Sequence, residues 1–244
     1  MTRAADQAAE FSDRLRALGA DTVELSVIAL EPPLNPGPLD RAIENLASYD
    51  WLIFTSVNGV RFFMDRLDQS RHDLRSLKAR ICAIGPATRK AIEELHLKVN
   101  LMPEEYVAES LVKAFAPENL PGKKVLLPRA AVARDVIPVE LLKLGAQVDV
   151  VEAYRNVVPP SATARAREIF SSDKKPDWIT FTSSSTVKNL LAITGPEALE
   201  GVHIASIGPV TSSTLCAHGL KVDAEAKQFT LDGLIDAILA FHQI

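Results

Sequence analysis

The sequence predicts an α/β protein of two domains, each built on a doubly wound parallel sheet, for three reasons. The chain has 244 residues, enough for about two domains of ~100 to 200 residues each. Short apolar runs alternate with segments of helical spacing, and this alternation is typical of βαβ units. Much of the sequence also occurs twice, so we expect two units of similar structure from one internal duplication.

The expected strands are short apolar runs, the pattern of strands that are buried on both faces of a parallel sheet. They lie at residues 23–28, 51–55, 80–84, 124–127, 148–154, 178–182 and 202–207. Helical spacing predicts helices at 5–18 and 136–144, and a glycine follows near the end of each, as is common where helices stop. Prolines cluster at 31–38 and 157–160, where neither a helix nor a central strand is expected to continue.

The repeat is visible in three pairs of segments. DWLIFTSVNGV at 50–60 recurs 127 positions later as DWITFTSSSTV, and ICAIGPAT at 81–88 recurs 123 positions later as IASIGPVT. The tripeptide LGA at 18–20 recurs 126 positions later. The duplication therefore spans nearly the whole chain.

The repeat also shows that the two copies begin differently. The second copy opens with GKKVLLPRA, a buried-strand pattern, whereas the first copy opens at Met1, which lies opposite Leu127. The first copy thus lacks most of its opening strand. We expect either a truncated or misassigned start, or a domain with a stunted central strand.

Composition narrows the classes of partner. Hydrophobic residues make up 47% of the chain and charged residues 24%, as in ordinary globular proteins. A net charge of −4 leaves no excess of basic residues to neutralise phosphates, which argues against nucleic acid. Cys82 and Cys216 stand alone and suggest neither a disulfide nor a zinc site. No signal-peptide pattern and no long apolar run is present, so we expect a cytoplasmic protein without a membrane partner.

Four loops between a strand and a helix carry small hydroxyl residues. In parallel sheets ligands bind beyond the carboxyl ends of strands, and free N–H groups at helix starts attract anions. A serine or threonine there is as readily a plain helix cap, so both interpretations stay open. The residues concerned are Thr55, Ser56 and Asn58; Thr182, Ser183 and Ser184; Thr88 in GPAT; and Thr211 in GPVT.

Tyr154 and two arginines are further candidates. Tyr154 ends a strand at the presumed domain junction, where its phenol could face a cleft, although packing is the simpler interpretation of this residue alone. Arg3 and Arg129 occupy equivalent strand ends, where a guanidinium can bind a carboxylate or pair with an acidic neighbour. No phosphate-binding glycine loop, HExxH or GxSxG motif accompanies them, so nucleotide and metal chemistry find little support.

Taken together, several segments resemble the uroporphyrinogen-III synthase family. They are DWLIFTSVNGV, ICAIGPAT, VLLPRA, VVEAYRNVVPP, PDWITFTSSSTV and IASIGPVTSSTLCAHGL followed by FTLDGLIDAI. The resemblance implies a lyase of porphyrin and heme biosynthesis that closes hydroxymethylbilane to uroporphyrinogen III, with loss of water and inversion of ring D. It also implies a monomer that uses no metal or organic cofactor, with hydroxymethylbilane synthase as the upstream partner.

The resemblance further implies two flavodoxin-like parallel-sheet domains joined by a two-stranded hinge. One domain combines 1–28 with 160–244, the other is 33–153, and the linkers are 29–32 and 154–159. Tyr154 matches a tyrosine that assists departure of the hydroxyl. Thr88 and Thr211 match cleft threonines, and Thr55, Ser56, Thr182 and Ser183 match strand-end hydroxyls. The basic residue that some members have near His203 is not carried over.

Two other functions remain open from the sequence. A hinge-type protein could bind a tetrapyrrole or another polycarboxylate without converting it, and product formation distinguishes this from an enzyme. A regulatory protein with a decayed synthase domain is less consistent with a chain that has no basic surface or DNA-reading segment.

Overall fold

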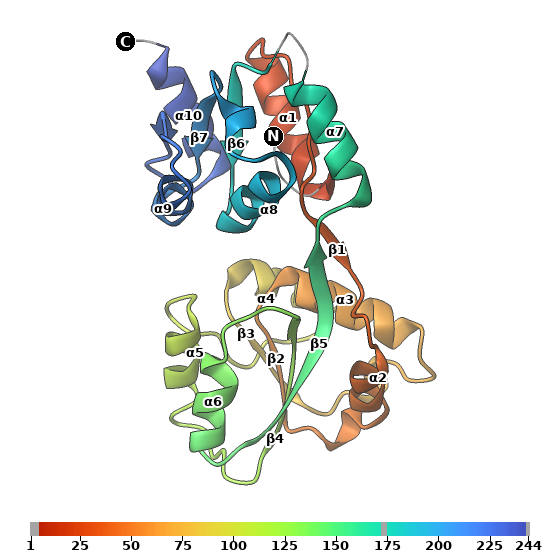
Figure 1. Cartoon of the computed structure of the whole chain (residues 1–244). Helices are drawn as coiled ribbons and strands as arrows, with labels where there is room; N and C mark the ends of the chain where they lie inside the picture. Colours follow the sequence, from red (N-terminus) through yellow and green to blue (C-terminus); the bar gives the residue numbers. More distant parts are fainter. Residues whose placement is uncertain (1–4, 172–174, 243–244) are drawn as a thin grey trace. The chain divides into compact units, whose positions relative to one another are not determined.

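The computed structural model describes residues 5–171 and 175–242, and the chain divides into two compact units. Unit 1 comprises Met1–Leu30 and Val157–Ile244, and unit 2 comprises Glu31–Asn156. Figure 1 shows the secondary structure of each unit. Each unit is an α/β structure around a sheet of parallel strands.

A five-stranded sheet, most of which belongs to unit 2, has the strand order β1-β5-β4-β2-β3 (Figure 1). Its strands are β1 (Ala29–Glu31), β2 (Trp51–Phe54), β3 (Arg80–Ala83), β4 (Lys124–Ala130) and β5 (Gln147–Val157). The pairs β2–β3, β2–β4 and β4–β5 are parallel. All four residues of β2 are buried, as expected for a central strand that is covered on both faces.

Helices cover both faces of this sheet. Alternate residues of a strand point to opposite faces, so Leu52 and Phe54 pack with α2, α3 and α4, whereas Trp51 and Ile53 pack with α5 and α6. The helices are α2 (Gly37–Glu44), α3 (Val57–Asp68), α4 (Pro86–Glu93), α5 (Ala108–Ala114) and α6 (Val136–Lys143), with 3₁₀ turns at Leu46–Ser48 and Leu74–Ser76. The sheet of unit 2 is therefore doubly wound.

Unit 1 repeats this construction, with three strands among its described residues. Its parallel sheet has the order β6-β7-β8, formed by β6 (Trp178–Phe181), β7 (His203–Ser206) and β8 (Ala224–Glu225). Helices α7, α8 and α9 contribute to one core cluster, and α1 and α10 contribute to another. The helices are α1 (Ala5–Ala17), α7 (Pro160–Phe170), α8 (Ser184–Thr194), α9 (Pro209–Ala217) and α10 (Leu231–Phe241), with a 3₁₀ turn at Glu197–Leu199.

The structure confirms six of the seven predicted strands and both predicted helices to within a few residues, but the strand predicted at 23–28 is wrong. Leu25 and Val27 are buried as a strand pattern would require, yet the backbone of this segment lies outside the sheet. The repeat places the counterpart of β4 at or before residue 4, outside the described residues. The expected opening strand of the first copy therefore falls outside the described residues.

The same hydrogen bonds recur at positions related by the repeat. Asn100 Oδ1 accepts a hydrogen bond from the backbone N–H of Ile81 at 2.8 Å, and Asp223 Oδ2 accepts one from that of Ile204 at 2.9 Å. Both pairs of positions are 123 apart. The same separation of 123 positions relates two strand contacts. The bridge between Cys82 and Leu101 corresponds to the pairing of Ala205 with Ala224.

Two further properties concern the described residues as a whole. None of the helices within 5–171 and 175–242 is both long and apolar enough to span a membrane. Both cysteines have free thiols, and burial raises the pKa of Cys82 to about 12, so this thiol is protonated at neutral pH.

Candidate active site

Tyr154 and Ser56 meet at the end of the sheet of unit 2. Ser56 follows β2 and caps α3, because its Oγ accepts a hydrogen bond from the Gly59 N–H at 2.9 Å. The same Oγ lies 3.1 Å from the phenol oxygen of Tyr154, and either oxygen can be the donor. Whichever oxygen donates to the other, the O–H of the accepting group remains available to a ligand.

The phenol ring of Tyr154 is held by stacking. Its ring lies against that of Phe62 with 5.4 Å between centroids and an interplanar angle of 18°. The guanidinium of Arg61 lies over the ring of Phe62, 4.9 Å from its centroid. Only 7% of Tyr154 is exposed. The sequence had not pointed to Phe62, although its place in the helix that Ser56 caps is a signal that could have found it.

A β-bulge turns Tyr154 toward α3. The β4–β5 register is regular from Lys124–Gln147 to Arg129–Glu152 and then shifts, so that Ala130 pairs with Tyr154 and Ala153 is the extra residue. Strand residues alternate between faces, so without this insertion position 154 would face the opposite side of the sheet. The bulge therefore creates the contact between Tyr154 and Ser56.

Thr55 and Arg129 line a hollow of about 190 Å³ within unit 2. The Arg129 side chain is 14% exposed and donates to Asp135 Oδ1 at 2.5 Å and to the carbonyl oxygen of Arg134 at 2.9 Å. Of the two interpretations of Arg129, the structure shows the pairing with an acidic neighbour. The other residues that line the hollow are Ile84, Tyr106, Val107, Ala108, Leu127, Ala133, Arg134 and Ile137.

Thr88 and Thr211 are both buried, with 4% and 3% of each residue exposed. Each is the third residue of a helix that begins with proline after a glycine cap, α4 in unit 2 and α9 in unit 1. Buried hydroxyls in the first turn of a helix stand beside unpaired backbone N–H groups. These two threonines thus occupy matching places, one in each unit.

The hydroxyls that follow β6 take part in contacts within unit 1. Ser183 Oγ caps α8 by accepting a hydrogen bond from the Thr186 N–H at 3.3 Å. Ser184 Oγ donates to the Val210 carbonyl at 3.2 Å and accepts from Thr214 Oγ1 at 2.7 Å, which ties α8 to α9. Thr182 is half-buried, as is Asn58 in unit 2. Arg3 lies outside the described residues.

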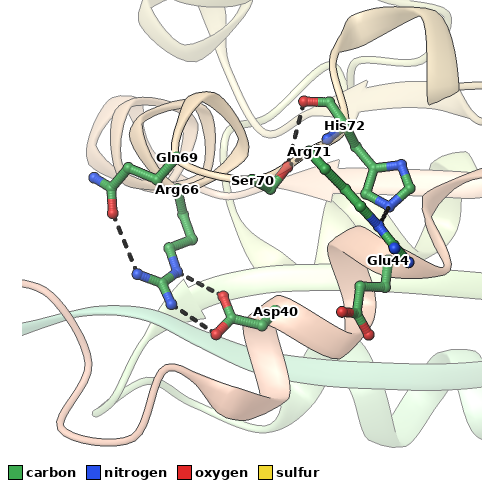
Figure 2. A pocket seen from close by; sticks show the side chains of 7 residues that line it. All are labelled: Asp40, Glu44, Arg66, Gln69, Ser70, Arg71 and His72. Atoms are coloured by element: carbon green, nitrogen blue, oxygen red, sulfur yellow. Dashed lines mark hydrogen bonds and ion pairs between the residues drawn. The ribbon is translucent and has the colours of Figure 1, made fainter.

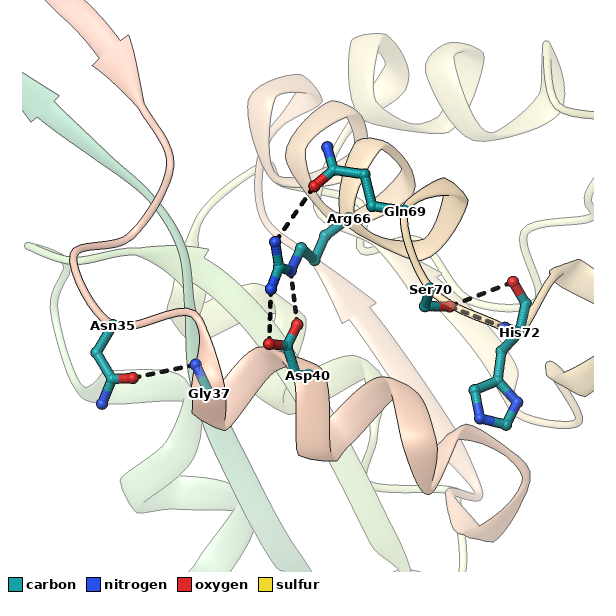
Figure 3. Close-up of polar contacts among 7 residues, drawn as sticks. All are labelled: Asn35, Gly37, Asp40, Arg66, Gln69, Ser70 and His72. Atoms are coloured by element: carbon teal, nitrogen blue, oxygen red, sulfur yellow. Dashed lines mark hydrogen bonds and ion pairs between the residues drawn. The ribbon is translucent and has the colours of Figure 1, made fainter.

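A larger hollow, of about 460 Å³, contains none of the predicted site residues (Figure 2). It lies beside the end of α3, whereas Ser56 marks the start of that helix. Arg66 donates from Nε and Nη2 to the carboxylate of Asp40 at 2.5 and 2.6 Å (Figure 3), and these hydrogen bonds lower the pKa of that carboxyl. Two of the charged groups that line this hollow, Arg66 and Asp40, are thus paired with each other.

The described residues hold no cluster of three or more histidine, cysteine or acidic side chains that could bind a metal ion. What they do provide are hydroxyls, helix N-termini, a phenol and a guanidinium at strand ends. These are donors for anions and for a departing oxygen. The fold and these groups define a class of protein, a two-unit α/β protein whose strand ends carry hydroxyls, helix N-termini, a phenol and a guanidinium.

Comparison with known proteins specifies the class. The family model described as uroporphyrinogen-III synthase HemD matches residues 9–236. A uroporphyrinogen-III synthase of Synechococcus elongatus is 37% identical over 250 residues, which cover 97% of this chain and 92% of that protein. A putative uroporphyrinogen-III synthase of Methanothermobacter thermautotrophicus is 34% identical, with 98% and 96% covered. The chain belongs to the uroporphyrinogen-III synthase family.

Solved structures support the fold. A mutant uroporphyrinogen III synthase from Thermus thermophilus matches with a TM-score of 0.66 at 20% identity, covering 96% of this chain and 94% of that one. A uroporphyrinogen-III synthetase from Helicobacter pylori matches with a TM-score of 0.63 at 21% identity, covering 90% and 95%.

Proposed function

We propose that this protein is a uroporphyrinogen-III synthase, a cyclising lyase that converts hydroxymethylbilane to uroporphyrinogen III with loss of water and inversion of ring D. The observation that carries the proposal is family membership over nearly the whole chain, from residue 9 to residue 236. The 37% identity to the Synechococcus elongatus enzyme supports it over the same length.

The substrate determines what the site must do. Hydroxymethylbilane carries eight carboxylates and one hydroxymethyl group, so the protein must hold anions and assist one leaving oxygen. The C–O bond breaks as the electron pair of the pyrrole forms an azafulvene, and the oxygen takes up a proton and leaves as water. Attack by the substituted carbon of ring D then gives a spiro intermediate, whose rearrangement inverts that ring.

Tyr154 is the proposed donor to the departing oxygen. Its phenol O–H can point to the substrate while its oxygen accepts a hydrogen bond from Ser56, which is 3.1 Å away. Stacking on Phe62 limits the positions of the ring, so the donor is held before the substrate arrives. Ser56 is a positioning residue in this mechanism, and its second role as the cap of α3 keeps it in place.

The carboxylates are bound by several groups in this proposal. Free N–H groups at the starts of α3, α4, α8 and α9 suit anions, together with Thr55, Asn58, Thr88, Thr182, Ser183, Ser184 and Thr211. Arg129 can exchange Asp135, which is 69% exposed, for a substrate carboxylate at low cost. No single contact then determines binding. Arg3 is proposed for the equivalent role on the basis of the repeat alone.

Several finer features of the proposal await direct measurement. An origin of both units in one duplication is supported by the matching hydrogen bonds of Asn100 and Asp223. The hinge formed by 29–32 and 154–159, the domains 1–28 plus 160–244 and 33–153, the monomeric state and the cytoplasmic location stay predictions. So do the supply of substrate by hydroxymethylbilane synthase and catalysis without a cofactor.

Product analysis tests the function. Freshly generated hydroxymethylbilane is supplied to the protein, the product is oxidised, and the isomers are resolved by chromatography beside a sample without protein. We expect predominant isomer III. Isomer I formed at the rate of the sample without protein would contradict the proposal and favour a non-catalytic tetrapyrrole-binding protein.

A further inference from the structure

Two exposed aromatic side chains differ in type from the other exposed hydrophobic residues. Among the described residues, the exposed large hydrophobic side chains are aliphatic except for Tyr106 and Phe229, which are 57% and 67% exposed. Aromatic rings bring a large apolar area to a contact, so a ring left in solvent marks a place where a ligand gains by covering it.

The two rings occupy equivalent positions. Phe229 follows Tyr106 by 123 residues, the same separation that relates ICAIGPAT to IASIGPVT. Each ring precedes a helix of its own unit, α5 for Tyr106 and α10 for Phe229. The two side chains differ only by the phenol hydroxyl, so the feature that both units share is the ring itself.

Each ring lies against the glycine of a GPxT loop. A Cβ atom at residue 85 would lie 3.2 Å from Cγ of Tyr106, and one at residue 208 would lie 2.8 Å from Cδ1 of Phe229. Gly85 has an extended backbone, with φ −167° and ψ 177°, which any residue adopts. The ring that rests on Gly85, and not the backbone conformation, therefore requires a residue without a side chain at this position.

In unit 2 the ring is also part of a polar hollow. Tyr106 lines the hollow of about 190 Å³ together with Thr55, Arg129 and Arg134. Arg134 pairs with Glu109 at 3.1 Å, and the Glu109 side chain is 53% exposed, so this guanidinium too can change partner at low cost. A flat apolar face beside two guanidinium groups and a hydroxyl suits a planar ring that bears carboxylates.

We propose that Tyr106 and Phe229 each contact the face of one pyrrole ring of the substrate and hold it over the GPxT loop of their unit. In unit 2, Arg129 and Arg134 bind the acetate or propionate of that ring. This inference rests on the proposed function, because it takes the substrate to be a tetrapyrrole. It assigns binding to Tyr106, Phe229 and Arg134, which lie outside the strand-end hydroxyl loops.

Leucine and aromatic exchanges separate ring contact from simple packing. Tyr106→Leu and Phe229→Leu keep an apolar side chain over the glycine but remove the ring, and Tyr106→Phe and Phe229→Tyr keep the ring. We expect the leucine variants to raise KM about tenfold, the loss of one ring contact of about 1.4 kcal/mol, with Tm unchanged. The aromatic exchanges should keep KM close to that of the unchanged protein.

Controls use exposed aliphatic residues of similar accessibility. Leu18 in unit 1 and Leu142 in unit 2 are both 55% exposed, and Leu18→Ala and Leu142→Ala should leave KM unchanged. A KM that stays the same in both leucine variants, while the unchanged protein makes isomer III, would overturn the ring contacts and leave the proposed function standing. An equal fall in Tm and an equal rise in KM in the leucine and aromatic exchanges would show a structural role and overturn the ring contacts too.

A binding measurement keeps the two proposals apart. Uroporphyrin III, the oxidised product, is titrated into the protein and followed by its own fluorescence. Weaker binding to the leucine variants than to the aromatic exchanges supports the ring contacts even if no isomer III is formed, in which case only the catalytic proposal fails. Equal affinity in all variants contradicts the ring contacts whatever the product analysis shows.

Discussion

Units 1 and 2 share their strand-end loops but differ in the groups beside them. Ser56 and Ser183, which are 127 positions apart, both cap the helix that follows the strand. The 126-residue repeat places Ile28 opposite Tyr154, and Ile28 packs against an apolar core. All three tyrosines of the chain, at positions 49, 106 and 154, belong to unit 2. Under the proposed mechanism, the comparison separates anion binding, which is assigned to both units, from proton donation, which is assigned to a phenol of unit 2.

The largest expected effect tests whether proton donation belongs to unit 2. Tyr154→Phe removes the phenol but keeps the stacking on Phe62, so we expect kcat to fall about a hundredfold with little change in Tm. Steady-state kinetics with hydroxymethylbilane measure this. Unchanged turnover would remove Tyr154 from the mechanism.

Tyr49 provides a matched control for this variant. It is also 7% exposed, and its phenol donates to Asp149 Oδ2 at 2.6 Å. Burial and this hydrogen bond raise its pKa, so it is a neutral donor at all ordinary pH values. Tyr49→Phe should cost about 1 kcal/mol of stability and leave kcat unchanged.

A smaller effect on kcat is expected when the two helix caps are removed in turn. Ser56→Ala and Ser183→Ala each remove a cap, and each should lower the free energy of unfolding by about 1 kcal/mol. Ser56→Ala also removes the partner of Tyr154, so we expect kcat to fall about tenfold, one step of ~1.4 kcal/mol, and to fall less in Ser183→Ala. Urea unfolding and steady-state kinetics on both variants decide this, and an equal loss of kcat would show that Ser56 acts only as a cap.

The smallest effect concerns pH. Unit 1 uses the carboxylate of Asp223 where unit 2 uses the amide of Asn100. Burial alone would raise the pKa of Asp223, but the Ile204 N–H, Lys221 and His203 outweigh it, so the pKa is lowered on balance. A carboxyl with a lowered folded-state pKa stabilises the fold above its unfolded pKa of about 3.9, and this contribution is lost as the pH falls through the lower value.

In Asp223→Asn, the free energy of unfolding should therefore fall less as the pH is lowered, by up to about 1 kcal/mol. In Asn100→Asp it should fall more. Urea unfolding from neutral pH down to about pH 3 follows the change around the carboxyl pKa. Profiles of identical shape for all three proteins would show that the two hydrogen bonds do not differ in their response to pH.

Short apolar runs predicted most of the strands, because strands that are buried on both faces of a sheet carry apolar residues at successive positions. β2 sends Leu52 and Phe54 to one face and Trp51 and Ile53 to the other, and this requires helices on both faces. Segment 23–28 also buries Leu25 and Val27, but it is not a strand, because burial of apolar side chains does not by itself make a strand.

The site was less predictable from the sequence. The resemblance named Tyr154 and Ser56, but their contact depends on a bulge at Ala153, which no residue pattern announces. The partner of Arg129 also depends on the conformation of the loop that carries Asp135. Tyr106 and Phe229 were missed because they lie in loops, although the 123-residue repeat already paired them.

The presence of both units in one chain has a consequence for how such a site can evolve. In a symmetric pair of identical chains, a tyrosine at one position would appear in both copies, since one codon specifies both. Here positions 28 and 154 are encoded separately, so one copy can keep an aliphatic core residue while the other gains a phenol. A substrate with many carboxylates but a single leaving hydroxyl matches that freedom, because repeated loops can share the carboxylates and one donor is enough.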